Sequence, residues 1–262
     1  MSTRQTDDEG REVWGRWALS IAGTSHVGRV RQSNQDSFDR FDDSARAEIL
    51  LVVADGMGGH RGGETASAMA VGTLGNLCRE GEGDAPTRLR SAIERANTEI
   101  FERASASRML KGMGTTVVAL LLSAEGAAFV AHVGDSRLYR LRNESLATLT
   151  EDHSLAAQLL RNREITAEEA RSHPRRSVLT RAVGVSGRRV EADVAPVDVR
   201  AGDAFLLCSD GIYEMLPDEE IQAVVANAPD AHTAVAWLVD AANQSGGKDN
   251  STAAVVQVSE AG

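Results

Sequence analysis

The chain has 262 residues, of which 42% are apolar and 25% are charged, enough for one large domain or two small ones with a full hydrophobic core. This composition excludes a chain that is disordered throughout. The 28 basic and 38 acidic residues give a net charge of −10, which argues against nucleic acid or an anionic membrane as the main partner but not against a cation.

The sequence carries no signal for a membrane or for secretion. Its longest apolar runs are strand-sized, well short of the roughly 18 residues that a membrane span requires. The first ten residues are polar and acidic, without the apolar stretch of a secretory signal. Cys78 and Cys208 each lie in an apolar segment, and no Cys/His spacing typical of a zinc site occurs. We therefore expect a cytoplasmic protein with two buried, reduced thiols.

The first half of the chain reads as strands, a helix pair and more strands. Residues 1–12 are predicted to be a disordered tail, and residues 13–259 one domain, because no linker or repeat interrupts the pattern. The apolar pattern predicts strands over 17–24, 37–41 and 48–54, helices over 64–79 and 86–106, and a three-stranded meander over 114–122, 127–133 and 137–141.

The second half begins with a polar, Arg/Glu-rich insertion over residues 152–178. It holds two short predicted helices, 155–163 and 167–172, and Thr166 with Glu169 forms a capping box at the start of the second. The remaining elements are predicted strands over 190–199, 204–208 and 252–258 and helices over 217–228 and 231–244. This order lacks strict βαβ alternation, so antiparallel sheets covered by helix pairs fit better than a parallel doubly wound sheet.

Five aspartates lie at the ends of predicted strands: Asp36, Asp55, Asp135, Asp210 and Asp249. Carboxylates that converge beside an apolar core repel one another, and a divalent cation removes that penalty. Oxygen ligands without Cys or an essential His suit Mg²⁺ or Mn²⁺. A glycine after Asp55 would let a backbone carbonyl approach such an ion. A single Asp-Gly pair is more often only a turn, so the repetition carries the argument.

Other phosphate-binding and nucleophile motifs fail on spacing. The glycine cluster after Asp55 has Arg61 where a dinucleotide fingerprint needs its third glycine. The Gly-Lys pair at 247–248 is followed by Asp249 where a P-loop needs Ser or Thr. No Gly-x-Ser-x-Gly elbow for a serine nucleophile is present.

Eight short motifs occur in an order that identifies a family. They are RQSNQD (31–36), ADGMGG (54–59), GMGTT (112–116), VGDSR (133–137), LTEDH (149–153), LTRAVG (179–184), CSDG (208–211) and KDN (248–250). With them the chain resembles the metal-dependent serine/threonine protein phosphatases of type 2C, the PPM family, in their compact bacterial form. The resemblance covers about residues 14–259 and implies an α+β fold, a four-layer α-β-β-α sandwich of two antiparallel sheets flanked by helix pairs. Residues 152–178 then correspond to the family's flap.

The resemblance also implies a set of metal ligands for two Mn²⁺ or Mg²⁺ ions. Asp55 would bridge the ions, with the Gly56 carbonyl on one and with Asp210 and Asp249 on the other. Asp135 looks like the family's ligand for a weaker third ion, shared with Asp210.

Three further residues would serve the reaction itself. Arg31 looks like the family's phosphate-binding arginine, Asp36 would sit close to the ions or bind one through water, and Asn250 would orient the neighbouring ligand. A water bridging the ions would lose a proton and attack phosphorus in line, without a phosphoenzyme. Met57 stands where animal members place a His, which leaves metal-bound water as the expected general acid and His60 as a weaker alternative.

The implied substrates are phosphoserine and phosphothreonine on proteins, and the implied partner is a serine/threonine kinase that phosphorylates them. Five arginines in 152–178 either meet acidic phosphopeptides or form a solvated face: Arg161, Arg163, Arg171, Arg175 and Arg176. We expect a monomer without nucleic-acid or membrane partners. Two alternatives stay open: a catalytically weak member that binds a phosphoprotein or kinase as a regulator, and a phosphoesterase for small phosphates or nucleotides.

Overall fold

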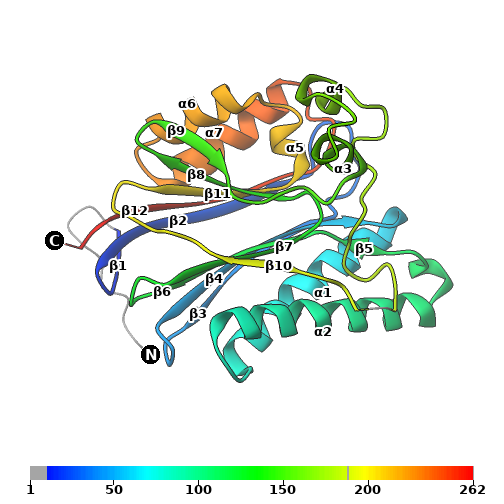
Figure 1. Cartoon of the computed structure of the whole chain (residues 1–262), viewed down its shortest axis with the longest axis horizontal. Helices are drawn as coiled ribbons and strands as arrows, with labels where there is room; N and C mark the ends of the chain where they lie inside the picture. The colour runs from blue at the N-terminus through cyan, green and yellow to red at the C-terminus, as the bar shows by residue number, and fades with distance from the viewer. Residues whose placement is uncertain (1–10, 188, 262) are drawn as a thin grey trace.

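The computed structural model describes residues 11–187 and 189–261, and it is built on two antiparallel six-stranded sheets packed face to face (Figure 1). In sheet order, the first contains β1 (Glu12–Trp14), β2 (Trp17–His26), β12 (Ser251–Glu260), β11 (Ala204–Cys208), β8 (Arg137–Arg142) and β9 (Ser145–Thr148). The second contains β10 (Asp193–Pro196), β7 (Ala128–Val133), β6 (Val117–Ser123), β4 (Glu48–Met57) and β3 (Asp36–Asp43), and β5 (Gly114–Thr115) pairs with the end of β4.

A pair of helices covers the outer face of each sheet, which makes four layers (Figure 1). The second sheet is covered by α1 (Gly59–Glu80) and α2 (Ala85–Ala106), and the first by α6 (Asp218–Asn227) and α7 (Ala231–Gln244). The other helical segments are short: η1 (Arg108–Leu110), α3 (Leu155–Arg161), α4 (Ala167–Arg171) and α5 (Asp210–Tyr213). The predicted four-layer sandwich is confirmed, and α3 and α4, which lie in the segment predicted as the flap, are at one end of it.

The apolar run in β4 shows why the strand lies at the centre of the fold. Alternate side chains of a strand point to opposite faces. Leu51 and Val53 pack in the core between the two sheets, while Leu50 and Val52 pack against the helix pair. A strand buried on both faces needs a nearly continuous apolar sequence, which is what residues 49–54 supply.

Local signals set the helix boundaries where the sequence is most informative. The Asp84 side chain caps α2 by accepting a hydrogen bond from the Thr87 backbone N–H at 2.9 Å, and Pro86 lies in the first turn. The predicted capping box is present: Thr166 accepts from the Glu169 N–H, and the Glu169 carboxylate accepts from the Thr166 N–H.

The three-stranded meander predicted over 114–141 is wrong. Residues 117–133 do form the hairpin β6–β7, but β8 crosses to the other sheet, where it pairs with β11 and with β9, a strand that the sequence did not reveal. The free edge of β7 pairs instead with β10, which is shorter than the strand predicted over 190–199. Apolar alternation marks a strand but does not identify its partner.

The remaining differences are small. Glu12, which we placed in the tail, is the first residue of β1, and residues 1–10 lie outside the described part of the chain. Cys78 and Cys208 are both buried and form no disulfide. Among the described residues, no helix has the length and apolarity to cross a membrane.

Candidate metal centre

The predicted aspartates converge at one end of the sandwich, around an open cavity of about 1320 Å³. Asp36 begins β3 and pairs in register with Asp55 on β4, while Asp210 follows β11 and Asp249 precedes β12. Because β3–β4 belong to one sheet and β11–β12 to the other, the cavity lies where the two sheets meet. All the predicted metal ligands line it: Asp55, Gly56, Asp135, Asp210 and Asp249.

Asp55 lies in a strand and not in the turn that an Asp-Gly pair usually forms. Its N–H donates to the Thr116 hydroxyl at 2.9 Å, and its carbonyl accepts from the Thr116 N–H and the Thr115 hydroxyl, both at 2.8 Å. These bonds use the backbone of Asp55 and leave its carboxylate to face the other aspartates.

Gly56 is required by close packing. A Cβ there would lie 2.1 Å from the Gly63 carbonyl oxygen and 2.6 Å from that of Gln35, and the Gly56 N–H donates to the same Gln35 oxygen at 3.1 Å. Any other residue would force β4 away from the start of α1 and so displace Asp55.

Asp36 is almost completely buried beside Asp55. One of its carboxylate oxygens accepts from the Ser209 hydroxyl at 2.7 Å and from the Thr252 hydroxyl at 2.6 Å. Burial raises the pKa of Asp36 to about 6, and the negative charge of Asp249 acts in the same direction. Ser209 directly follows β11 and Thr252 lies in β12, so Asp36 links the sheets directly behind the cavity.

The pKa values of three further carboxyl groups around the cavity are raised in the same way. Burial, followed by the charges of the neighbouring aspartates, raises the pKa values of Asp55 and Asp210 well above 3.8. Burial also raises the pKa of Asp135 to about 7, with the charge of Asp152 next in effect. One oxygen of Asp210 is buried without a hydrogen-bond partner in the described part of the chain. A cluster of oxygen donors with these properties fits a hard divalent cation.

Arg31 lies at the rim of the cavity, where its side chain is 53% exposed. It donates to an Asp249 carboxylate oxygen at 2.6 Å, and this hydrogen bond raises the Arg31 pKa. The guanidinium has five N–H donors, so most of them remain available to an anion in the cavity.

Asn250 plays a broader part than the predicted orientation of Asp249. Its side chain donates to the carbonyls of Val27 and Ser33 at 2.9 and 3.0 Å and accepts from the Gln35 N–H at 2.8 Å. Only its backbone N–H bonds the Asp249 carboxylate, at 2.8 Å. Asn250 therefore holds the loop between β2 and β3, which carries the phosphate-binding candidate.

The sequence did not single out Thr116, Ser209 or Thr252, whose hydroxyls fix Asp55 and Asp36. Thr116 and Ser209 stand inside two of the quoted motifs, so their position was the available signal. For Thr252, the only signal in the sequence was a polar residue within an apolar strand. Met57, which stands where animal members place a His, lines the cavity, and the side chain of His60, the weaker general-acid alternative, lies outside the described part.

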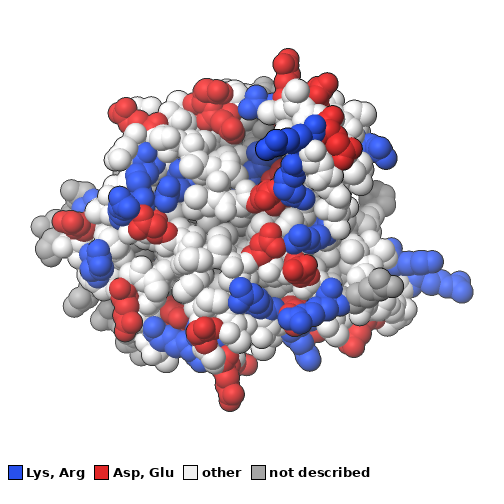
Figure 2. All heavy atoms as spheres, viewed as in Figure 1, with Lys and Arg blue, Asp and Glu red and all other residues white. Residues whose placement is uncertain are grey.

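The flap does not present its arginines as one basic surface. Arg161 pairs with Glu151 at 2.5 Å and Arg176 with Glu214 at 3.0 Å. Figure 2 shows acidic side chains interspersed with basic ones over this end of the molecule. The interpretation of the flap as a solvated, mixed-charge face therefore fits better than a continuous acceptor for acidic peptides.

Comparison with known proteins identifies the family to which this chain belongs. Residues 22–249 match the family model described as protein phosphatase 2C. The chain belongs to the protein phosphatase 2C family. It is thus a metal-dependent enzyme that removes phosphate from serine and threonine residues of proteins, as the motifs predicted.

Individual relatives agree with this assignment. The phosphatase is 41% identical to the serine/threonine phosphatase stp of Listeria monocytogenes, over 88% of this chain and 92% of that protein. The crystal structure of the Mycobacterium tuberculosis serine/threonine phosphatase PstP/Ppp superposes with a TM-score of 0.83 at 36% identity, covering 92% of this chain and 99% of that one. A structure of the PstP catalytic domain in complex with two manganese ions superposes with a TM-score of 0.80 at 34% identity, covering 92% and 99%.

Proposed function

We propose that Asp55, the Gly56 carbonyl, Asp210 and Asp249 hold two Mn²⁺ or Mg²⁺ ions, and that Asp135 and Asp210 share a third. The observation that carries this proposal is the convergence of carboxylates whose pKa values are raised by burial and, for Asp55 and Asp210, also by the charges of the neighbouring aspartates. The unpartnered Asp210 oxygen supports it, because a buried carboxylate oxygen without a donor needs a ligand.

Ions bound there would lower the pKa of a coordinated water and neutralise charge on the phosphoryl group. Arg31 would bind the non-bridging oxygens of the phosphate through two parallel N–H donors. Asp36, held by two hydroxyls, would fix the position of Asp55 from behind. The described residues that line the cavity include no Cys and no His, which supports direct transfer to water without a phosphoenzyme.

The substrates are phosphorylated proteins, and we propose that a serine/threonine kinase of the same cell produces them. An open cavity suits a phosphorylated side chain presented on a protein surface, since such a substrate cannot enter a closed pocket. The monomeric state and the cytoplasmic location stay predictions from the sequence.

The proposal is tested by hydrolysis of p-nitrophenyl phosphate and of a phosphothreonine peptide. Both reactions should require Mn²⁺ or Mg²⁺ and should stop when EDTA removes the ions. Turnover that persists in metal-free buffer would refute the metal mechanism. Free nucleotides serve as the comparison substrate, and rates on them that exceed the peptide rate would favour a small-phosphate esterase.

A further inference from the structure

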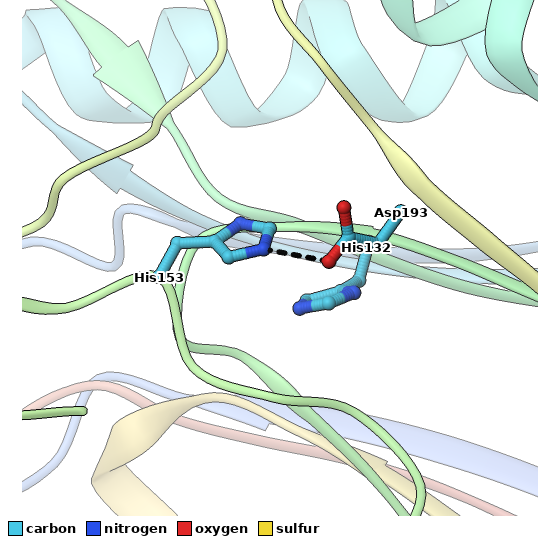
Figure 3. Close-up of side chains that lie close together, drawn as sticks. All are labelled: His132, His153 and Asp193. Carbon is cyan, nitrogen blue, oxygen red and sulfur yellow. Dashed lines mark hydrogen bonds and ion pairs between the residues drawn. The ribbon is translucent and has the colours of Figure 1, made fainter. Parts of the chain in front are cut away.

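A group of buried side chains behind the Asp135 turn has no part in the function described so far. His132 on β7 and His153 in the segment entering the flap stack with ring centroids 4.4 Å apart, and Asp193 on β10 lies beside them (Figure 3). Nε2 of His153 lies 3.1 Å from an Asp193 carboxylate oxygen, and Nε2 of His132 bonds the Glu151 carbonyl at 2.8 Å. Two histidines and a carboxylate at such distances could in principle bind a cation.

The hydrogen bonds of His153 argue for a different role. The Gly134 N–H donates to Nδ1 of His153 at 3.1 Å, so that nitrogen carries no proton. In a neutral imidazole the proton is then on Nε2, which donates to Asp193. An ion on Nε2 would move the proton to Nδ1, where it would oppose the Gly134 N–H. Burial lowers the His153 pKa, in keeping with a neutral ring.

His153 forms hydrogen bonds with both the N–H and the carbonyl of Gly134. Its own backbone N–H donates to the Gly134 carbonyl at 2.8 Å, in addition to the bond from the Gly134 N–H to its ring. Gly134 has φ +109°, and a Cβ there would lie 2.6 Å from the Thr116 methyl group. This turn therefore has little freedom, and the next residue is Asp135.

The backbone of Asp135 is also fixed on its other side. The Tyr213 hydroxyl donates to the Asp135 carbonyl at 3.0 Å, and the Ser136 and Thr116 hydroxyls lie 2.6 Å apart. Hydrogen bonds thus fix the backbone on both sides of the Asp135 side chain. The turn that His153 holds therefore sets the direction of the Asp135 carboxylate.

Asp193, itself paired with Arg181, fixes the side of the His153 ring that faces away from Gly134. Arg181 donates to the second Asp193 oxygen at 2.9 Å, and the His153 carbonyl accepts from the Thr180 N–H at 2.8 Å. Ser177 and residues 179–182 line the cavity, so His153 joins the chain leaving the flap to the Asp135 turn.

We propose that His153 is a positioning residue that holds Asp135 in the orientation needed for the weakest of the three cation sites. This inference rests on the proposed function, because it assumes that Asp135 binds an ion. Residues that orient a metal ligand through hydrogen bonds change metal affinity by roughly 10- to 100-fold when they are replaced.

The test is titration of the full-length protein with Mn²⁺, following free Mn²⁺ by electron paramagnetic resonance. In His153→Gln the side chain places no acceptor at the Nδ1 position, and the third Mn²⁺ should bind at least ~10-fold more weakly while the two tighter ions bind as in the wild type. In His153→Asn, Oδ1 takes the place of Nδ1 and can accept from Gly134, so the third ion should be restored. His132→Gln keeps the bond to Glu151 and is the matched control with three ions.

Asp135→Asn separates the failure of this inference from failure of the proposed function. It should lose the third ion, and His153→Gln added to it should change nothing further. If Asp135→Asn loses the third ion but His153→Gln binds it as tightly as the wild type, the positioning role is refuted. Retention of three ions in Asp135→Asn would refute the ligand assignment and this inference with it, and a wild-type protein that binds no Mn²⁺ would refute the proposed function itself. A weakening of all three sites in His153→Gln would show a general structural role and overturn the inference.

Discussion

Replacing Asp55 or Asp210 by Asn should lower the turnover of a phosphothreonine peptide at least ~100-fold at saturating Mn²⁺, because charge on a metal ligand carries several kcal/mol of transition-state stabilisation. Both residues are partly buried and line the cavity, and an amide keeps the shape of the side chain while removing its charge. Steady-state kinetics on the peptide measures the loss.

Asp240→Asn is the matched control, since Asp240 is an exposed residue of α7 on the outer face of the sandwich. It should leave turnover unchanged. Near-normal turnover in Asp55→Asn or in Asp210→Asn would show that the residue in question is not an essential ligand.

Removing the ions should make the free energy of unfolding depend strongly on pH. Asp36 and Asp135 have pKa values of about 6 and about 7 in the fold, against 3.8 in the unfolded chain, mainly because they are buried. Between these values the folded protein binds more protons than the unfolded one, so this cluster makes the metal-free protein less stable as pH rises from about 4 to about 7. The combined effect should be on the order of a few kcal/mol.

Urea denaturation in EDTA and in Mn²⁺, at steps from pH 4.5 to pH 8, measures this effect. Other titrating groups, such as His132 and His153, contribute to both series, so the difference between the series isolates the cluster. Stabilisation by Mn²⁺ should grow as pH rises, because the ligands must lose protons to bind it. In EDTA at pH 7, Asp55→Asn should be more stable than the wild type. A difference that stays constant over the whole range would contradict mutual repulsion among these carboxylates.

Strongly patterned segments were predictable from the sequence. Residues 204–208 and 231–244 are strand and helix as predicted, because the first is a short continuous apolar run and the second repeats its apolar residues with a period of 3.6. The second helix was placed within one residue, since Pro86 marks its first turn. The grouping of strands and helix pairs along the chain favoured antiparallel sheets covered by helices, and the four-layer order was implied by the family resemblance.

The start of α1 was missed because tertiary packing overrides local propensity there. Glycines disfavour a helix, so the sequence predicted a start at Glu64, yet α1 begins at Gly59. The reason lies outside the helix: a Cβ on Gly63 would come within 2.6 Å of the Gly56 carbonyl oxygen. Glycine at 63 lets the first turns of the helix approach the strand that carries Asp55.

For the site too, the sequence of one segment predicted some residues, while others could be recognised only from the fold. The aspartates were visible because each stands at the end of an apolar run. The contacts that fix them join segments remote in sequence: Thr252 reaches Asp36, and the Asn250 side chain holds the loop before β3. Such pairings depend on which strands are neighbours, and periodicity does not contain that information.

Anomalous scattering from a crystal grown with Mn²⁺ tests the central claim most directly. Two strong manganese peaks should lie between Asp55, Asp210 and Asp249, within about 2.0–2.6 Å of their carboxylate oxygens, with a weaker peak between Asp135 and Asp210. Absence of manganese among these aspartates at saturating Mn²⁺, or a principal peak at His132, His153 and Asp193, would contradict the account.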